Sequence, residues 1–214
     1  MNKLLFIDTL ATGLSPERCA IYRIGGIFCH ETLGGMEEQQ RFELCVRPFG
    51  GARIADSSLW VGGMTRSRLV NFPPQEDAFA QFYDIVCENI DIRNPKDKIY
   101  LAGFNSSAFD APFLRSWFER NGNGRFRDCF HVQTIDLMCL AAFALMNERS
   151  DMPDFHLETA ARFLGLSAVK GEKYSCLDNA ATCLQMYRTL RVRLHTADEG
   201  SYKMTNKLYV NHIL

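Results

Sequence analysis

Residues 6–14 read Phe6-Ile7-Asp8-Thr9-Leu10-Ala11-Thr12-Gly13-Leu14. The apolar run that leads into this motif, residues 4–7, has the pattern of a buried strand. The strand delivers one carboxylate, Asp8, and Gly13 then permits a turn or a close approach of the backbone. An acid in this place suits a metal site that must meet a phosphate. Asp at a strand end is more often a turn former, however, so the motif needs support from other carboxylates of the chain.

The size and charge of the chain limit its class. It has 214 residues, a formal net charge of −1 and a composition typical of globular proteins. This length predicts one domain, residues 1–195, followed by a tail at residues 196–214 with no assigned role. A protein that follows a long nucleic acid by neutralising phosphates usually needs more positive charge. One that grips only the end of a strand through metal ions does not.

The cysteines and apolar runs indicate a compartment. The eight cysteines are widely scattered, form no CxxC pair and are not flanked by histidines at zinc spacing. We therefore expect reduced thiols in a cytoplasmic protein. No apolar run reaches membrane-spanning length, and Met1-Asn2-Lys3 leads into a strand rather than a signal peptide, so no membrane contact is expected.

The order of apolar segments predicts the architecture. Residues 4–7, 21–29 and 41–46 are predicted to form an antiparallel meander, with the polar residues 31–40 as the turn between the last two strands. Strands and helices then alternate. The predicted elements are a loop or short helix at 57–69, a helix at 75–90, a strand at 98–104, a helix ending at Asn121-Gly122, a short strand at 130–135, and helices at 137–146 (capped by Asp136), 156–164 and 179–194. This order predicts a mixed α/β sheet with helices on its faces.

Two later carboxylates lie at the junctions of core elements. Asp110 follows a predicted strand and is near the start of the next helix, where it could also be an acid that interacts with the helix dipole. Asp178 opens the last helix, where it could also be an N-cap. If the two converge with Asp8, the cluster needs a neutralising charge. Mg²⁺ and Mn²⁺ prefer such oxygen ligands and leave positions for a substrate phosphate.

These motifs resemble those of the DnaQ-like 3′–5′ exonucleases, also called DEDD after their four acidic metal ligands. Residues 6–14 resemble the family's first motif, Phe-x-Asp-x-Glu-Thr-Thr-Gly-Leu, and residues 105–114 resemble the second, which ends Phe-Asp-x-x-Phe-Leu. Asp178 followed by Thr182 resembles the third motif, and Gly63-Met64-Thr65 resembles the Gly-Ile-Thr loop. Residues 134–137 and 156–166 match further segments. The resemblance covers roughly residues 3–190 in the family's order, which makes it specific.

The resemblance implies a ribonuclease H-like fold, α/β with a mixed five-stranded sheet flanked by helices. It also implies metal-assisted hydrolysis at the 3′ end of single-stranded nucleic acid with one or two Mg²⁺ or Mn²⁺ ions. Asp8, Asp110 and Asp178 would be the metal ligands. Leu14 would wedge against the terminal base, although it could equally be a partly buried loop anchor. The implied substrate-binding residues are Thr12, Gly13, Leu14, Gly63, Met64, Asn105 and Phe109.

The chain departs from the family pattern at Leu10 and Ala11 in the first motif, where Ala11 replaces a Thr, and at Lys173 before the third. Leu10 stands where the family has its second acid, and Leu donates nothing to a metal. Lys173 stands where one subclass has His, whereas Tyr174 fits the spacing of the subclass that uses Tyr. Tyr174 could orient a metal-bound water, or it could simply pack on the core. We expect one surviving metal site and a weakened exonuclease. The alternative is an inactive relative that binds nucleic acid ends or a protein partner.

Overall fold

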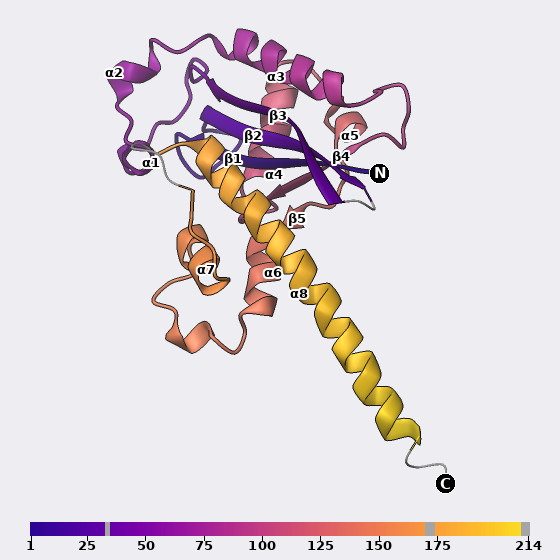
Figure 1. The fold of residues 1–214 in the computed structure, drawn as a ribbon. Coiled ribbons are helices and arrows are strands. Elements are labelled where there is room, and N and C mark those ends of the chain that lie inside the picture. Colours follow the sequence, from indigo (N-terminus) through magenta and orange to yellow (C-terminus); the bar gives the residue numbers. More distant parts are fainter. Residues whose placement is uncertain (33–34, 170–173, 211–214) are drawn as a thin grey trace.

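A computed structural model of the chain describes residues 1–32, 35–169 and 174–210, and the side chains of these residues up to residue 193. Five strands form one sheet in the order β3-β2-β1-β4-β5 (Figure 1). The strands are β1 (Asn2–Ala11), β2 (Ile21–Thr32), β3 (Gly35–Cys45), β4 (Ile99–Gly103) and β5 (Ile135–Asp136). β1 and β3 both pair antiparallel with β2, β4 pairs parallel with β1, and β5 pairs parallel with β4. The predicted meander and mixed sheet are confirmed.

The strands β2 and β3 are longer than predicted. Glu31 pairs with Met36 and Thr32 with Gly35, so most of the segment predicted as a turn, residues 31–40, is strand. Gly34 of that predicted turn lies outside the described residues. The prediction was wrong because β3 is an edge strand with one exposed face, and such a strand accepts a run of polar residues without losing its backbone pairing.

Eight α-helices and one 3₁₀ turn are present in the described part of the chain. They are α1 (Asp56–Val61), α2 (Arg66–Leu69), α3 (Gln75–Asn89), α4 (Asp110–Arg120), α5 (Phe126–Cys129), α6 (Leu137–Ala144), η1 (Arg149–Asp151), α7 (Leu157–Phe163) and α8 (Cys176–Val210). Asp136 caps α6 as predicted, accepting a hydrogen bond from the backbone N–H of Met138. α8 continues through most of the predicted tail and projects beyond the sheet in Figure 1.

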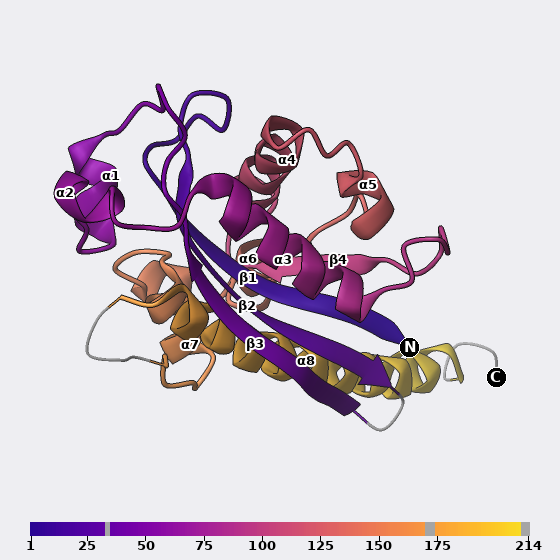
Figure 2. The same cartoon turned by 90° about the horizontal axis from the view of Figure 1, so that it is seen from above.

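The strand β1 is buried on both faces, which explains its continuous apolar run. Leu5 and Ile7 contact the core beneath α3 and α4, where the aromatic rings of Phe79, Phe82, Trp117 and Phe118 pack edge to face or tilted. Leu4 and Phe6 point to the opposite face, which α6, α7 and α8 cover. Figure 2 shows the sheet between these two layers of helices.

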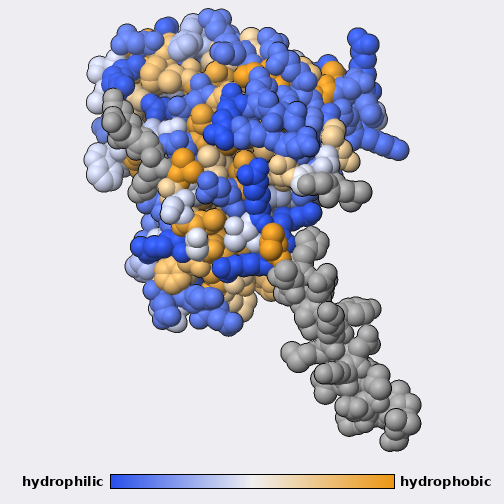
Figure 3. Space-filling view, in the orientation of Figure 1, coloured by the Kyte–Doolittle hydropathy of each residue, from blue (hydrophilic) through white to orange (hydrophobic). Residues whose placement is uncertain are grey.

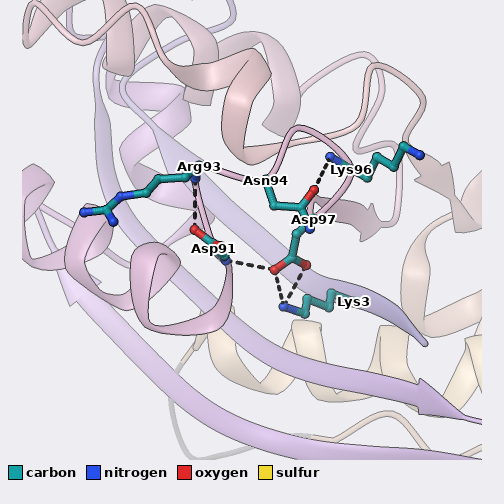
Figure 4. A network of polar contacts seen from close by, with 6 residues as sticks. All are labelled: Lys3, Asp91, Arg93, Asn94, Lys96 and Asp97. Carbon is teal, nitrogen blue, oxygen red and sulfur yellow. Dashed lines mark hydrogen bonds and ion pairs between the residues drawn. The ribbon is translucent and has the colours of Figure 1, made fainter.

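The amino end of β1 is fixed by an ion pair far along the strand from Asp8. Lys3 Nζ lies 2.8 Å from one carboxylate oxygen of Asp97 and 2.7 Å from the other (Figure 4). Asp97 also accepts a hydrogen bond from the backbone N–H of Asp91, so the loop before β4 is held against the sheet.

The surface is mainly polar and the cysteines are unpaired. The face drawn in Figure 3 is mostly hydrophilic, with apolar side chains scattered between polar ones. All eight cysteines are free thiols. Across the described residues, no helix combines the length and apolarity needed to cross a lipid bilayer.

Candidate active site

The carboxyl end of β1, the start of α8 and helix α1 come together at one end of the sheet (Figures 1 and 2). Asp8 belongs to the second half of β1. β4 pairs with β1 only as far as Phe6, so Asp8 lies just beyond the paired end of β4. On its other side Asp8 pairs with Gly25 of β2. A Cβ atom at Gly25 would lie 2.5 Å from the backbone N of Leu177. The absence of a side chain there lets the first turn of α8 reach the strand that carries Asp8.

The first turn of α8 is held in place by Glu43 of β3. One Glu43 carboxylate oxygen accepts hydrogen bonds from the Leu177 backbone N–H at 3.2 Å and from Ser175 Oγ at 3.0 Å. A carboxylate at a helix N-terminus satisfies a free N–H group and complements the helix dipole. Glu43 therefore acts as a cap supplied by a distant strand.

Three donors near the start of α8 surround the Asp8 carboxylate. Tyr174 Oη donates to Asp8 Oδ2 at 3.2 Å, and Tyr174 in turn accepts from Asn179 Nδ2 at 2.8 Å. The side chains of Cys176 and Asn179 also hydrogen-bond to Asp8. Burial nevertheless raises the pKa of Asp8 to about 6, because these donors only partly replace lost hydration.

Asp110 is the first residue of α4, and its side chain is only 3% exposed. Thr9 Oγ1 donates to Asp110 Oδ1 at 2.6 Å, which ties Asp110 to the residue after Asp8. Burial, followed by the negative charge of Asp8, raises the pKa of Asp110 to about 8. Two neighbouring buried carboxylates can both be ionised only if a nearby positive charge stabilises them.

The loop before α4 is held by Asp136. The Asp136 carboxylate accepts the backbone N–H of Asn105 at 3.1 Å and of Ser107 at 3.0 Å. Asn105 adopts a positive φ of 64°, a conformation that Asn tolerates better than most residues. This turn aims α4, and with it Asp110, at the end of β1. In the sequence Asp136 is a predicted helix cap within the family-like segment 134–137, and its hydrogen bonds to the Asn105 turn are seen only in the structure.

Asp178 lies in the first turn of α8 and is partly buried. Among the described residues, no three His, Cys, Asp or Glu side chains lie close enough to hold a metal ion together. The structure brings Asp110 close enough to Asp8 for the Asp8 charge to act on it, and the metal roles of Asp8, Asp110 and Asp178 stay predictions. Lys173 lies outside the described residues.

Leu10 points into an apolar cluster rather than into a vacant ligand position. Its side chain is 6% exposed and belongs to a cluster with Tyr22, Leu59, Met64, Leu69 and Cys176. A Cβ atom at Gly62 would lie 2.6 Å from Leu10 Cδ1, so the end of α1 sits directly on Leu10. Where the family pattern has an acid, this chain has a contact that fastens α1 and α2 to β1.

The predicted substrate-binding residues fall into buried and exposed groups. Thr12 is fully buried: its N–H donates to Ala20 O and its carbonyl accepts from Ala55 N, both at 2.8 Å. Met64 is buried in the Leu10 cluster, and Phe109 packs on Phe113 with ring centroids 4.8 Å apart. Leu14 is 84% exposed. Gly13 is buried, and Gly63 is exposed with a φ of 59°.

Solved structures share this architecture. E. coli exonuclease I in complex with a 5cy-dT13 oligonucleotide superposes with a TM-score of 0.70 at 15% identity, over 100% of this chain and 46% of that one. The chain has the fold of exonuclease I. A product-bound structure of exonuclease I gives 0.68 at 16% identity, over 90% of this chain and 44% of that one. The zinc-bound E. coli exonuclease I–ssDNA complex gives a TM-score of 0.67 at 15% identity, over 90% of this chain and 41% of that one.

The likeness to exonuclease I confirms the predicted ribonuclease H-like fold. At this identity it establishes the fold alone, and the chain spans less than half the length of these structures. No family model and no curated protein matches the chain in sequence.

Proposed function

We propose that the chain is a 3′–5′ exonuclease for single-stranded nucleic acid that works with Mg²⁺ or Mn²⁺, at a rate lowered by Leu10 and Lys173. The main support for this proposal is a pair of buried carboxylates at the end of the sheet, Asp8 and Asp110, whose pKa values are both raised. Exonuclease I, which has the same fold, is known in complexes with single-stranded oligonucleotides and with zinc. Both observations support the proposal.

The donor set fits one divalent ion. Mg²⁺ is commonly held by one or two carboxylates together with water and substrate phosphate oxygens, and Asp8 and Asp110 supply two carboxylates. A bound ion would supply positive charge to these acids and to the phosphate. Position 10 carries Leu in place of the carboxylate that a second ion would need, and the surroundings of Leu10 are apolar. We therefore expect one ion.

The other side chains position the acids. Thr9 fixes the Asp110 carboxylate, and Tyr174 fixes that of Asp8. Burial and the charge of Asp8 raise the pKa of Tyr174 well above its usual range, so Tyr174 stays a phenol and donates its proton in the hydrogen bond to Asp8. Tyr174 can thus orient an attacking water but cannot take a proton from it.

Binding of nucleic acid ends without cleavage is the second candidate. Tyr174, Cys176 and Asn179 already give the Asp8 carboxylate hydrogen bonds, so Asp8 is partly satisfied without a cation. The apolar surroundings of Leu10 favour the same reading. The other form of this alternative is an inactive relative that binds a protein partner in place of nucleic acid.

Degradation of a single strand labelled at its 5′ end, in Mn²⁺, tests the proposal. The comparison is between the chain as it stands, Asp8→Ala, Asp110→Asn and the control Asp77→Ala, which changes an exposed acid of α3. The proposal expects stepwise shortening from the 3′ end by the unchanged chain and the control only. Binding of the strand without shortening would select the second candidate. Shortening that survives Asp8→Ala would refute the assigned site.

A further inference from the structure

One long edge of the sheet has no neighbouring strand. β3 is the last strand in the order β3-β2-β1-β4-β5, so it pairs on one side only. From Gln40 to Cys45 it pairs with β2 in unbroken register, and within the described residues the backbone of residues 40–44 bonds to no other backbone segment. Alternate N–H and C=O groups of an edge strand point away from the sheet. This stretch of β3 can therefore pair with a further strand.

Helix α3 lies beside this edge and makes it one wall of a groove. The two elements run in the same direction in Figures 1 and 2, and a pocket of about 620 Å³ lies between them. Residues 40–44 of β3 form one wall, and Gln81, Asp84, Ile85 and Glu88 of α3 form the other. We call this pocket the β3–α3 groove.

The β3–α3 groove is held open by contacts between its walls. The Phe42 ring of β3 packs edge to face on Phe82 of α3, with ring centroids 5.8 Å apart. Asn89 Nδ2, at the end of α3, donates to Gln40 Oε1 at 3.0 Å. Because these contacts fix α3 beside β3, a ligand would enter a preformed site and would not have to order it.

The walls of the groove are negatively charged. α3 contains four acids and no Lys or Arg, a formal charge of −4, and β3 contains three glutamates and one arginine, a charge of −2, whereas the whole chain carries −1. Arg41 is matched by Glu38 at 2.7 Å, and Glu43 is bonded to the start of α8. Asp84 and Glu88 are exposed, and in the part of the chain that the structure describes neither forms an ion pair. These two carboxylates give the groove its charge.

The spacing of Asp84 and Glu88 matches the repeat of a strand. Four residues advance about 6 Å along a helix, and alternate residues on one face of a strand are about 6.6 Å apart. A strand added to β3 with Lys or Arg at every second position would therefore present one cation to each acid. A second copy of β3 would bring its own negative charge, and a nucleic acid would bring phosphates, so both would be repelled.

We propose that the β3–α3 groove binds an extended basic segment of a partner protein, which adds to β3 as a further strand and places Lys or Arg side chains against Asp84 and Glu88. Main-chain hydrogen bonds to β3 would supply affinity, and the two acids would select the partner's charge. This site is separate from the Asp8–Asp110 pair and needs neither a metal nor a nucleic acid.

Binding of a model peptide to the full chain tests the proposal. The probe is an acetylated, amidated and fluorescently labelled peptide of about six residues in which Lys and Val alternate, the usual length of a strand. Anisotropy should show saturable binding. Asp84→Asn combined with Glu88→Gln should raise Kd about 2- to 30-fold, the product expected for two exposed ion pairs. Glu88→Gln keeps an acceptor for the Gln40 side chain, so the fold is preserved.

The matched control is Glu76→Gln combined with Asp77→Asn. It makes the same change of charge on the same helix, at exposed acids that do not line the groove, and should leave Kd unchanged. Equal weakening in the control would overturn the proposal, because the peptide would then respond to the overall charge of α3 and not to the groove.

Hydrogen exchange separates strand addition from simple charge attraction. With the peptide at about ten times its Kd, the outward-facing amides of residues 40–44 should exchange about tenfold more slowly. A peptide with N-methyl groups on alternate residues keeps its lysines but loses backbone donors, and it should bind more weakly. Equal binding of the N-methylated peptide, or unchanged exchange of these amides, would overturn the proposal. A dimer in sedimentation whose β3 amides are protected without peptide would also overturn it, in favour of a second copy as the occupant.

Discussion

Replacing Leu10 with Glu restores the acid of the family pattern and tests whether this position alone weakens the site. The structure predicts that the change is costly. Leu10 is 6% exposed, so its loss forfeits about 1.5–3 kcal/mol of apolar burial. A carboxyl group placed among Tyr22, Leu59 and Met64 without partners adds about 1–3 kcal/mol. We expect Leu10→Glu to lower the free energy of unfolding by about 3–5 kcal/mol in the absence of metal.

Urea unfolding of Leu10→Glu and of the uncharged, similarly sized Leu10→Gln separates packing from metal binding. Both should be destabilised without metal, because both bury a polar group. Mn²⁺ should stabilise Leu10→Glu more than Leu10→Gln, since a site filled at 100 times its Kd contributes about 2.7 kcal/mol.

Strand shortening in Mn²⁺ is then measured on the same samples. A gain of rate in Leu10→Glu but not in Leu10→Gln would identify position 10 as the cause of the weak activity. The reasoning fails if Leu10→Glu is as stable as the unchanged chain in EDTA, because Leu10 would then not lie in a closed apolar cluster.

Three further predictions follow from the same site. In metal-free buffer the folded protein keeps protons on Asp8 and Asp110 that the unfolded chain releases near pH 4. The free energy of unfolding should therefore fall as the pH rises from about 4 to 8. Between pH 6 and 8 the fall should come from Asp110, at about 1.4 kcal/mol per pH unit. Urea unfolding should show this slope, and Asp110→Asn should remove the part above pH 6; a flat profile contradicts it. Gly25→Ala should destabilise the protein by about 1–3 kcal/mol and slow shortening, because its Cβ meets the first turn of α8; the control is Gly50→Ala, where a Cβ meets nothing. Tyr174→Phe should raise the pKa of Asp8 further through loss of a donor, seen by NMR titration, and an unmoved Asp8 pKa would deny the hydrogen bond.

Local patterns in the sequence determined most of the fold. The apolar run at residues 4–7 is buried on both faces of the sheet, as a continuous run requires. The Asp136 cap and the helix of residues 75–90 were predicted from neighbouring residues and are present. The edge strand β3 was misjudged because its polar residues are paired through the backbone, which side-chain polarity does not reveal.

The acids of the candidate site were found in the sequence because each lies in a short motif with a recognisable order. The partners of these acids depend on contacts between elements far apart in the chain. Glu43, from β3, caps the first turn of α8, and Gly25, from β2, lets that turn approach Asp8. No local pattern marks Cys176 as a donor to Asp8.

The tertiary structure alone decided the meaning of Leu10 and the state of the two acids. In the sequence Leu10 is a missing ligand, whereas in the fold it is a packed residue beneath α1. Burial likewise raises the pKa of Asp8, and burial together with the charge of Asp8 raises that of Asp110; both causes exist only once the chain is folded. The sequence determined which side chains are available for chemistry; distances and loss of water, set by packing, decided how they are charged.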